Sequence, residues 1–213
     1  MTGTTSNGSA QKGPLHAGVT GLLAAIRTEE WVFARSLCPS QLEEAGTPAA
    51  PSIKELVARA SAARRTATKL LRTVGHGGEA DGCEEPGEPR LGTWVEVHRD
   101  AHAAMSDLWA AVEQVSEDQL TADAGPPRSH PQYLWRDVIN LAVRGPFHSY
   151  ADWHLRAGRV LGSLAVLSRW YEAVRGPDLP TKVRSDASYD LACGLARVGR
   201  LDAAMEYLPD AFT

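Results

Sequence analysis

The 213-residue sequence contains only three cysteines, and their arrangement excludes two common kinds of cysteine-based site. Cys38, Cys83 and Cys193 form no C-x-x-C pair, and their number is odd. Cysteine-rich zinc sites and disulfide frameworks normally show such pairs or an even count. The cysteine pattern therefore predicts neither kind of site and favours a reducing, cytoplasmic location.

Long apolar runs, strand patterns and familiar catalytic motifs are also missing. No apolar stretch approaches the roughly 18 residues that a membrane-spanning helix needs, and residues 1–14 lack the apolar core of a signal peptide. The sequence has no G-x-S-x-G, P-loop or G-x-G-x-x-G motif. It also has no basic run with interleaved aromatic residues. We therefore expect neither a membrane nor a nucleic-acid partner.

Apolar residues recur at helical spacing along most of the chain. In "SIKELVARASAARRTATKLL" they fall at every third or fourth position, which places them on one face of a helix. Breaks rich in glycine and proline separate the predicted helices. These cover residues 13–38, 51–75, 93–115, 129–158 and 160–174, with a final pair within 186–212. The chain is predicted to be all-α.

Three predicted helices begin with a capping box, in which Ser or Thr and a Glu or Gln three residues later bind free backbone N–H groups. The pairs are Ser52 with Glu55, Thr93 with Glu96, and Ser129 with Gln132. Gly145-Pro146 is expected to kink or interrupt the fourth helix. The helix lengths predict an antiparallel four-helix bundle over residues 15–158. A disordered tail, 1–14, precedes it, and a helical extension, 159–213, packs on it.

Two short motifs lie on the second and fourth predicted helices. They are "PSIKELVAR", residues 51–59, and "YADWH", residues 150–154. They resemble motifs of the DinB-like four-helix-bundle superfamily, whose metal-binding members have a histidine at the position of Arg59 and carry H-x-x-x-H on the fourth helix. Here Tyr150 replaces the first of those two histidines and His154 is retained. The resemblance implies a relative of metal-dependent thiol transferases that lacks two of the three metal ligands.

The end of the chain has a second recognisable pattern. "ASYDLACGLARVGRLDAAMEYLPDAF" resembles a tetratricopeptide repeat, with Gly199 between its two helices. "YADWHLRAGRVLGSLAVLSRWYEAV" resembles a weaker copy, with Gly158 at the turn. Such repeats need about three units for stability. The resemblance therefore implies a helical hairpin that packs on the bundle, with a surface for a protein partner.

Two histidines flank a tyrosine in "HSYADWH". His148 and His154 are six positions apart, so their side chains lie about 120° apart on a helix and do not share one metal ion without a rearranged turn. Tyr150 and His154 are four apart and share one face. A neutral histidine beside a tyrosine suits acid–base catalysis near neutral pH, which makes Tyr150 and His154 candidate catalytic residues. The alternative is a satisfied, partly buried polar pair.

His98 and His102 form another candidate pair, in "HRDAH". They share one helical face, and zinc or nickel would need a third ligand from another helix. His154 is the natural third ligand if the third and fourth helices face each other. We expect no metal cofactor, with a zinc or nickel site of His98, His102 and His154 as the alternative.

Arg59 and Trp153 are candidate ligand-binding residues. A guanidinium does not ligate a cation, and if Arg59 points inward it needs a carboxylate or phosphate partner; a surface arginine is the alternative. Most of the six tryptophans are expected in the core, yet several can wall a pocket between helices. Residues 128–200 carry eleven Lys and Arg against six Asp and Glu, which suits an anionic ligand or an acidic partner; the alternative is charges spread over solvated helix faces.

These patterns leave three functions open. The first is a small-molecule-binding DinB-like protein, a metal-independent tailoring or self-resistance enzyme or a binder, with an interhelical pocket. The second is a metal-dependent DinB-type thiol S-transferase. The third is a TPR-like module that holds a protein partner. They require, in turn, an aromatic pocket with Arg59 inside, three converging metal ligands, or an open apolar groove beside residues 186–212.

Overall fold

The computed structural model describes residues 12–47, 50–76, 91–122, 133–176 and 178–212, and this part of the chain is helical and contains no strand. The elements are α1 (Pro14–Arg35), α2 (Pro39–Glu43), α3 (Ile53–Gly75), α4 (Trp94–Gln114), α5 (Glu117–Thr121), α6 (Leu134–Ile139), η1 (Asn140–Arg144), α7 (Gly145–Arg156), α8 (Val160–Ala173), α9 (Thr181–Arg197) and α10 (Leu201–Ala211). The predicted all-α class is confirmed. None of the described helices is long and apolar enough to cross a membrane.

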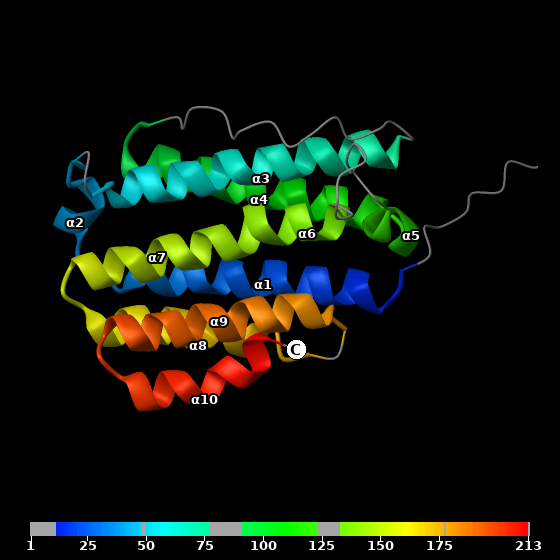
Figure 1. The fold of residues 1–213 in the computed structure, drawn as a ribbon. Coiled ribbons are helices and arrows are strands. Elements are labelled where there is room, and N and C mark those ends of the chain that lie inside the picture. The colour runs from blue at the N-terminus through cyan, green and yellow to red at the C-terminus, as the bar shows by residue number, and fades with distance from the viewer. Residues whose placement is uncertain (1–11, 48–49, 77–90, 123–132, 177, 213) are drawn as a thin grey trace, which may run out of the picture.

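The helices α1, α3, α4 and the composite helix α6–η1–α7 lie side by side (Figure 1). The apolar stripe predicted on α4 faces the core: Val97, Ala101, Met105, Leu108 and Val112 are each at most 5% exposed. Burial of such a stripe supplies most of the stability of an amphipathic helix.

Two of the predicted helix starts are confirmed by their caps. Both capping boxes, Ser52 with Glu55 and Thr93 with Glu96, make their two reciprocal hydrogen bonds. The predicted box of Ser129 and Gln132 lies outside the described residues, as does most of the predicted tail.

The composite helix passes through Gly145-Pro146 without a break. Proline has no N–H to donate, and its ring clashes with the carbonyl four residues earlier. The chain accommodates Pro146 with one π-helical turn, in which the N–H of Gly145 bonds the carbonyl of Asn140, five residues back. The expected disturbance is therefore a widened turn, a known response to such positions.

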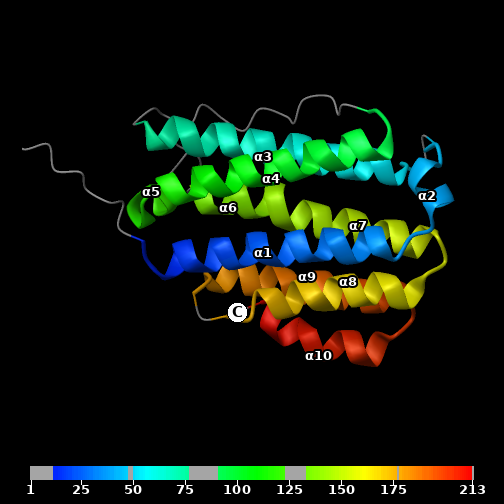
Figure 2. The ribbon, with the colours of Figure 1, turned by 180° about the vertical axis from the view of Figure 1, so that it is seen from behind.

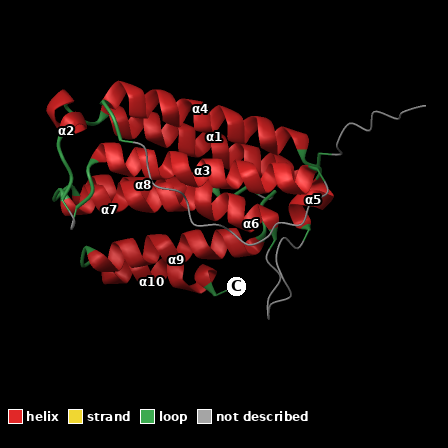
Figure 3. Cartoon of the chain, turned by 90° about the horizontal axis from the view of Figure 1, so that it is seen from above, coloured by secondary structure: helices red, strands yellow, loops and turns green. Residues whose placement is uncertain are grey.

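The helices α8, α9 and α10 follow in sequence, each packed on the one before, and α8 also contacts α7 and α1 (Figures 2 and 3). Gly158 and Gly199, with φ of 71° and 79°, make the turns that lead into α8 and α10, as predicted. The helix α9 begins at Thr181, five residues before the predicted start. Pro180 ends the preceding loop, and Val183 already faces the core.

Candidate functional site

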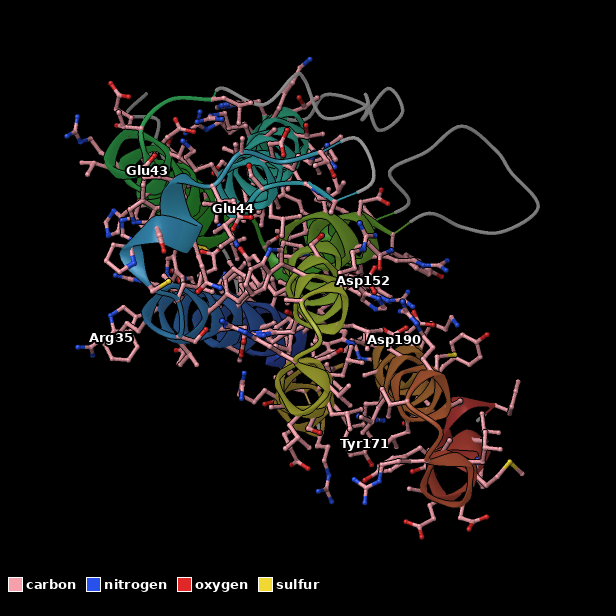
Figure 4. All side chains as sticks on the ribbon, turned by 90° about the vertical axis from the view of Figure 1, so that its left-hand side faces the viewer. Arg35, Glu43, Glu44, Asp152, Tyr171 and Asp190 are labelled. Atoms are coloured by element: carbon pink, nitrogen blue, oxygen red, sulfur yellow. The ribbon has the colours of Figure 1, made fainter. Side chains whose placement is uncertain are left out.

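A cavity of about 570 Å³ lies where α2, the start of α3 and the end of α7 meet. We call it the end pocket. Figure 4 looks onto this end of the molecule and labels two of its lining residues, Glu44 and Asp152. Its size falls within the range of about 300–1,000 Å³ that is typical of small-molecule sites. It is lined by Gln41, Glu44, Ala45, Thr47, Ala50, Pro51, Ser52, Ile53, Leu56, Arg59, Ser149, Asp152, Trp153, Arg156 and Ala157.

The start of α3 fixes one wall of the end pocket. The Ser52 hydroxyl accepts the backbone N–H of Glu55 at 3.1 Å, and the Glu55 carboxylate accepts that of Ser52 at 2.5 Å. The preceding loop approaches so closely that a Cβ on Gly46 would collide with the Glu55 carboxylate. This capping box holds both the loop and the first turn of α3, and the second turn carries Arg59.

Arg59 and Trp153, the two predicted ligand-binding residues, line the same cavity. Arg59 is exposed and has no ion pair or hydrogen bond from its side chain within the described residues. Trp153 is half-buried, and its ring is held between Phe33, 5.4 Å away edge-on, and the Arg159 guanidinium, 5.4 Å from its centroid. The end pocket therefore combines an uncompensated cation with a fixed indole.

Acidic and basic side chains share the rim of the end pocket. Arg156 joins Arg59, whereas Glu44 and Asp152 carry the opposite charge. Asp152 accepts a hydrogen bond from Arg197 of α9 at 2.8 Å, which compensates its charge. The charges that line the cavity are therefore balanced, two basic against two acidic side chains, and the attraction for a negatively charged group comes from Arg59 and not from the rim as a whole.

Tyr150 lies in the interior and does not line the end pocket. It is fully buried, and its hydroxyl donates to Glu30 Oε1 at 2.8 Å. The equally buried Arg64 donates from Nη1 to Glu30 Oε2 at 3.0 Å, and its Nη2 lies 2.6 Å from Oε1 without hydrogen-bond alignment. Burial and the charge of Glu30 raise the pKa of Tyr150 well above its ordinary value. Tyr150 is therefore a neutral donor within a buried ion-pair network.

His154 shares the inner face of α7 with Tyr150, as its spacing predicted, but makes different contacts. Its ring centroid lies 5.3 Å from that of Phe33, on which Tyr150 stacks at 4.5 Å. Within the described residues, Nδ1 of His154 has no hydrogen-bond partner, and a Cβ on Gly162 would come within 2.7 Å of it. Burial, and then the charge of Arg159, lower the pKa of His154. The imidazole is thus a packed, neutral group.

His98 and His102 line a smaller cavity, of about 160 Å³, between α1, α3 and α4. Glu30 and Trp94 also line it, whereas His154 does not. Over the ranges that the structure describes, no group of three or more His, Cys, Asp or Glu side chains is arranged to hold a metal ion. The structure therefore does not bring His98, His102 and His154 together as ligands.

His148 points toward the C-terminal helices. Its Nε2 lies 2.8 Å from Oδ2 of Asp190, which is labelled beside α9 in Figure 4. The same carboxylate accepts hydrogen bonds from Arg144 at 2.9 and 2.7 Å and from the indole N–H of Trp170 at 3.1 Å. Burial acts to raise the pKa of Asp190, but the contacts with His148 and Arg144 outweigh it and lower that pKa. Asp190 therefore joins α9 to η1, α7 and α8.

The tryptophans are less uniformly buried than expected. Trp135 and Trp170 belong to the core, whereas Trp31 is 57% exposed. The other three are partly buried against the core: Trp94, Trp109 and Trp153. The expectation that most of the six would lie in the core is therefore wrong, since two do. Trp153 keeps one side open to the end pocket.

Sequence reasoning missed the buried charges. Arg64 lies between Ala60 and Ala67 on the apolar stripe of α3, and Asp190 lies three residues after the buried Ala187. A charged residue inside an apolar stripe is a signal that was available, because such a residue must find a partner. Its partner is not signalled, since Arg64 meets Glu30 across helices.

Comparisons of the chain with protein-family models, with curated proteins and with solved structures find no match. What the end pocket binds is therefore inferred from its own side chains. These offer an uncompensated guanidinium on one wall and a fixed indole on another.

Proposed function

We propose that this protein binds a small organic anion, of the aromatic carboxylate class, in the end pocket. The observation that carries the proposal is the convergence of Arg59 and Trp153, from α3 and α7, on one cavity of about 570 Å³. A guanidinium without a protein partner binds a carboxylate through two parallel hydrogen bonds. The indole face supplies an apolar surface for the rest of the ligand.

The proposal is limited to binding. Tyr150 and His154, the candidate catalytic residues, line no part of the end pocket. Tyr150 donates its proton to Glu30, and His154 packs on Phe33. A general acid or base must reach the reacting group of its ligand directly or through one water, and neither side chain is placed for that.

A relation to DinB-like bundles would fit this site. Metal-binding members carry histidine at the position of Arg59, and a guanidinium there repels a cation and attracts an anion. The order of α1, α3, α4 and α6–η1–α7 supports this relation, and the hairpin of α9 and α10 around Gly199 supports the resemblance to a tetratricopeptide repeat. The metal-dependent transferase has less support, because His98, His102 and His154 do not converge.

Calorimetric titration with benzoate, phenylacetate and indole-3-acetate tests the proposal, with benzamide as the neutral counterpart of benzoate. We expect at least one of the carboxylates to bind, and benzamide to bind more weakly than benzoate. Arg59→Gln should weaken carboxylate binding by about 10- to 100-fold, because a hydrogen bond to a charged group contributes about 1.5–3 kcal/mol. Arg99→Gln is the matched control, since Arg99 is an exposed arginine of α4 outside the end pocket.

A second substitution tests the aromatic wall. Trp153→Leu should weaken the binding of indole-3-acetate more than that of acetate, because only the former has a ring to lay on the indole. The proposal is wrong if none of the carboxylates binds at millimolar concentration. It is also wrong if Arg59→Gln and Arg99→Gln bind them equally well.

A further inference from the structure

The end pocket contains an acidic side chain whose charge no described side chain compensates. Of the four described charged residues that line it, Asp152 pairs with Arg197 and Arg156 has an interaction of its own. The Glu44 carboxylate is exposed and, within the described residues, has neither an ion pair nor a hydrogen bond. Arg59, on another wall, is likewise unpaired. The cavity therefore offers a ligand both a cation and an anion.

Contacts on both sides of Glu44 hold its backbone at the cavity. It follows α2 directly, and the preceding Glu43, labelled beside it in Figure 4, accepts a hydrogen bond from Lys54 of α3 at 2.8 Å. After Glu44, the loop closes with two backbone hydrogen bonds between Thr47 and Ala50, at 2.8 and 3.0 Å. A ligand therefore has only the Glu44 side chain to order, and little affinity is lost to ordering the chain.

Glu44 and Arg59 line the same cavity, but no ion pair joins them. Opposite charges separated by water attract each other weakly, so both remain available to a ligand. A ligand with a carboxylate alone, bound at Arg59, would leave Glu44 unpaired in the same cavity and would be repelled by it. A ligand that also carries a cationic group would pair with both side chains, and each of its charges would meet the opposite charge.

We propose that the ligand of the end pocket is zwitterionic, namely an aromatic amino acid or a short peptide that ends in one. Its carboxylate binds Arg59, its ammonium group binds Glu44, and its ring lies on Trp153. This inference rests on the proposed function, because Arg59 must hold the carboxylate. It adds the reason for selectivity: a site that pairs an ammonium group rejects the analogue without it, which leaves the Glu44 carboxylate without a partner.

Two pairs of ligands, each differing only by an ammonium group, test this inference in calorimetric titrations of the full chain near neutral pH. One pair is tryptophan and indole-3-propionate, and the other is glycyl-tryptophan and N-acetyl-tryptophan. The zwitterions of the two pairs differ in the separation of their charges, so the comparison distinguishes an amino acid from a peptide. In at least one pair, the zwitterion should bind about three- to tenfold more tightly than its counterpart, as expected between an exposed ion pair and a charged hydrogen bond within a cavity.

Substitutions of Glu44 test whether this carboxylate causes the preference. Glu44→Gln should abolish the preference for the zwitterion, and Glu44→Arg should reverse it, because a guanidinium repels the ammonium group. Glu206→Gln is the matched control, since Glu206 is an exposed residue of α10 outside the end pocket, with no side-chain partner within the described residues. It should leave the preference unchanged. Circular dichroism verifies that each variant is folded.

The titrations separate this inference from the proposed function. Indole-3-propionate binding that Arg59→Gln weakens, with no gain from the ammonium group in either pair, overturns the zwitterionic ligand and leaves the carboxylate site standing. A preference that Glu44→Gln and Glu206→Gln leave equally strong also overturns it. If none of the carboxylates binds, the proposed function itself is wrong, and this inference is wrong with it.

Discussion

Replacing Asp190 by asparagine should loosen the attachment of the C-terminal helices. The carboxylate is 3% exposed, and side-chain nitrogens of Arg144, His148 and Trp170 lie 2.7 to 3.1 Å from its oxygens. Asparagine has nearly the same shape as aspartate but no charge, and its NH2 group is a donor that would face the N–H donors now bound by the carboxylate. Breaking a buried pair costs about 3–5 kcal/mol. Because the Arg144 side chain is 28% exposed and can be rehydrated, we expect the lower end, about 3 kcal/mol.

Urea unfolding, followed by circular dichroism and tryptophan fluorescence, measures this loss. In a chain of this size, about 3 kcal/mol corresponds to a fall in Tm of about 6–12 °C. Asp152→Asn is the control, because the Asp152 side chain is 41% exposed and pairs with Arg197 at the surface. It should cost less than about 1 kcal/mol. A loss for Asp190→Asn no greater than that of the control would show that the Asp190 carboxylate does not hold the C-terminal helices in this way.

The stability that Asp190 contributes should depend on pH. The folded pKa of Asp190 is lowered, so its charge stabilises the fold above the unfolded value of about 3.9. That contribution is lost as the pH falls below about 4 toward the folded pKa. The stability difference between wild type and Asp190→Asn should therefore shrink on acidification below about pH 4. A difference that grows there would contradict the assigned direction of the shift.

Three further substitutions probe the interior. Tyr150→Phe removes the hydrogen bond to Glu30 and should lower the free energy of unfolding by about 1–2 kcal/mol in urea titrations; no loss would contradict this. Gly162→Ala should lower the free energy of unfolding by about 1–3 kcal/mol, because its methyl group would collide with His154. Gly21→Ala should raise it by about 0.5–1 kcal/mol, because the space around Gly21 is open. Equal effects of the two substitutions would contradict the close packing of Gly162 on His154. The pKa of His154 is lowered in the fold, so below about pH 6.5 the unfolded chain takes up a proton that the folded chain does not. The free energy of unfolding therefore decreases as the pH decreases. Between pH 7.5 and pH 5.5, the Tm of His154→Gln should therefore fall by less than the Tm of the wild type. An equal fall would contradict the lowered pKa of His154.

Local rules were sufficient for much of the fold. The capping boxes at Ser52 and Thr93 and the positive-φ turns at Gly158 and Gly199 depend on residues within a few positions of one another. Such features are visible in the sequence because the interacting groups are close along the chain. The form of the turn before Pro146 is not visible in the sequence, because a kink, a break and a π-helical turn all relieve the same clash.

The candidate site shows the limit of those rules. Helical spacing correctly placed Tyr150 and His154 on one face, but their roles depend on Glu30 and Phe33 of α1, more than one hundred residues earlier. Spacing carries no information on such long-range contacts. Arg59 is a candidate because it stands where the resembled DinB-like motif has a histidine, and its place in the end pocket follows only from how α3 and α7 pack.

An anion site formed by Arg59 and Trp153 is tested by an NMR titration of ¹⁵N-labelled protein with indole-3-acetate, which reports the indole and arginine side-chain N–H signals. We expect saturable shifts of the Trp153 indole and Arg59 Nε signals. The Trp170 indole, buried on Asp190, should not shift. Shifts confined to Trp94, in the smaller cavity beside His98, or no shifts at all, would contradict an anion site at Arg59 and Trp153.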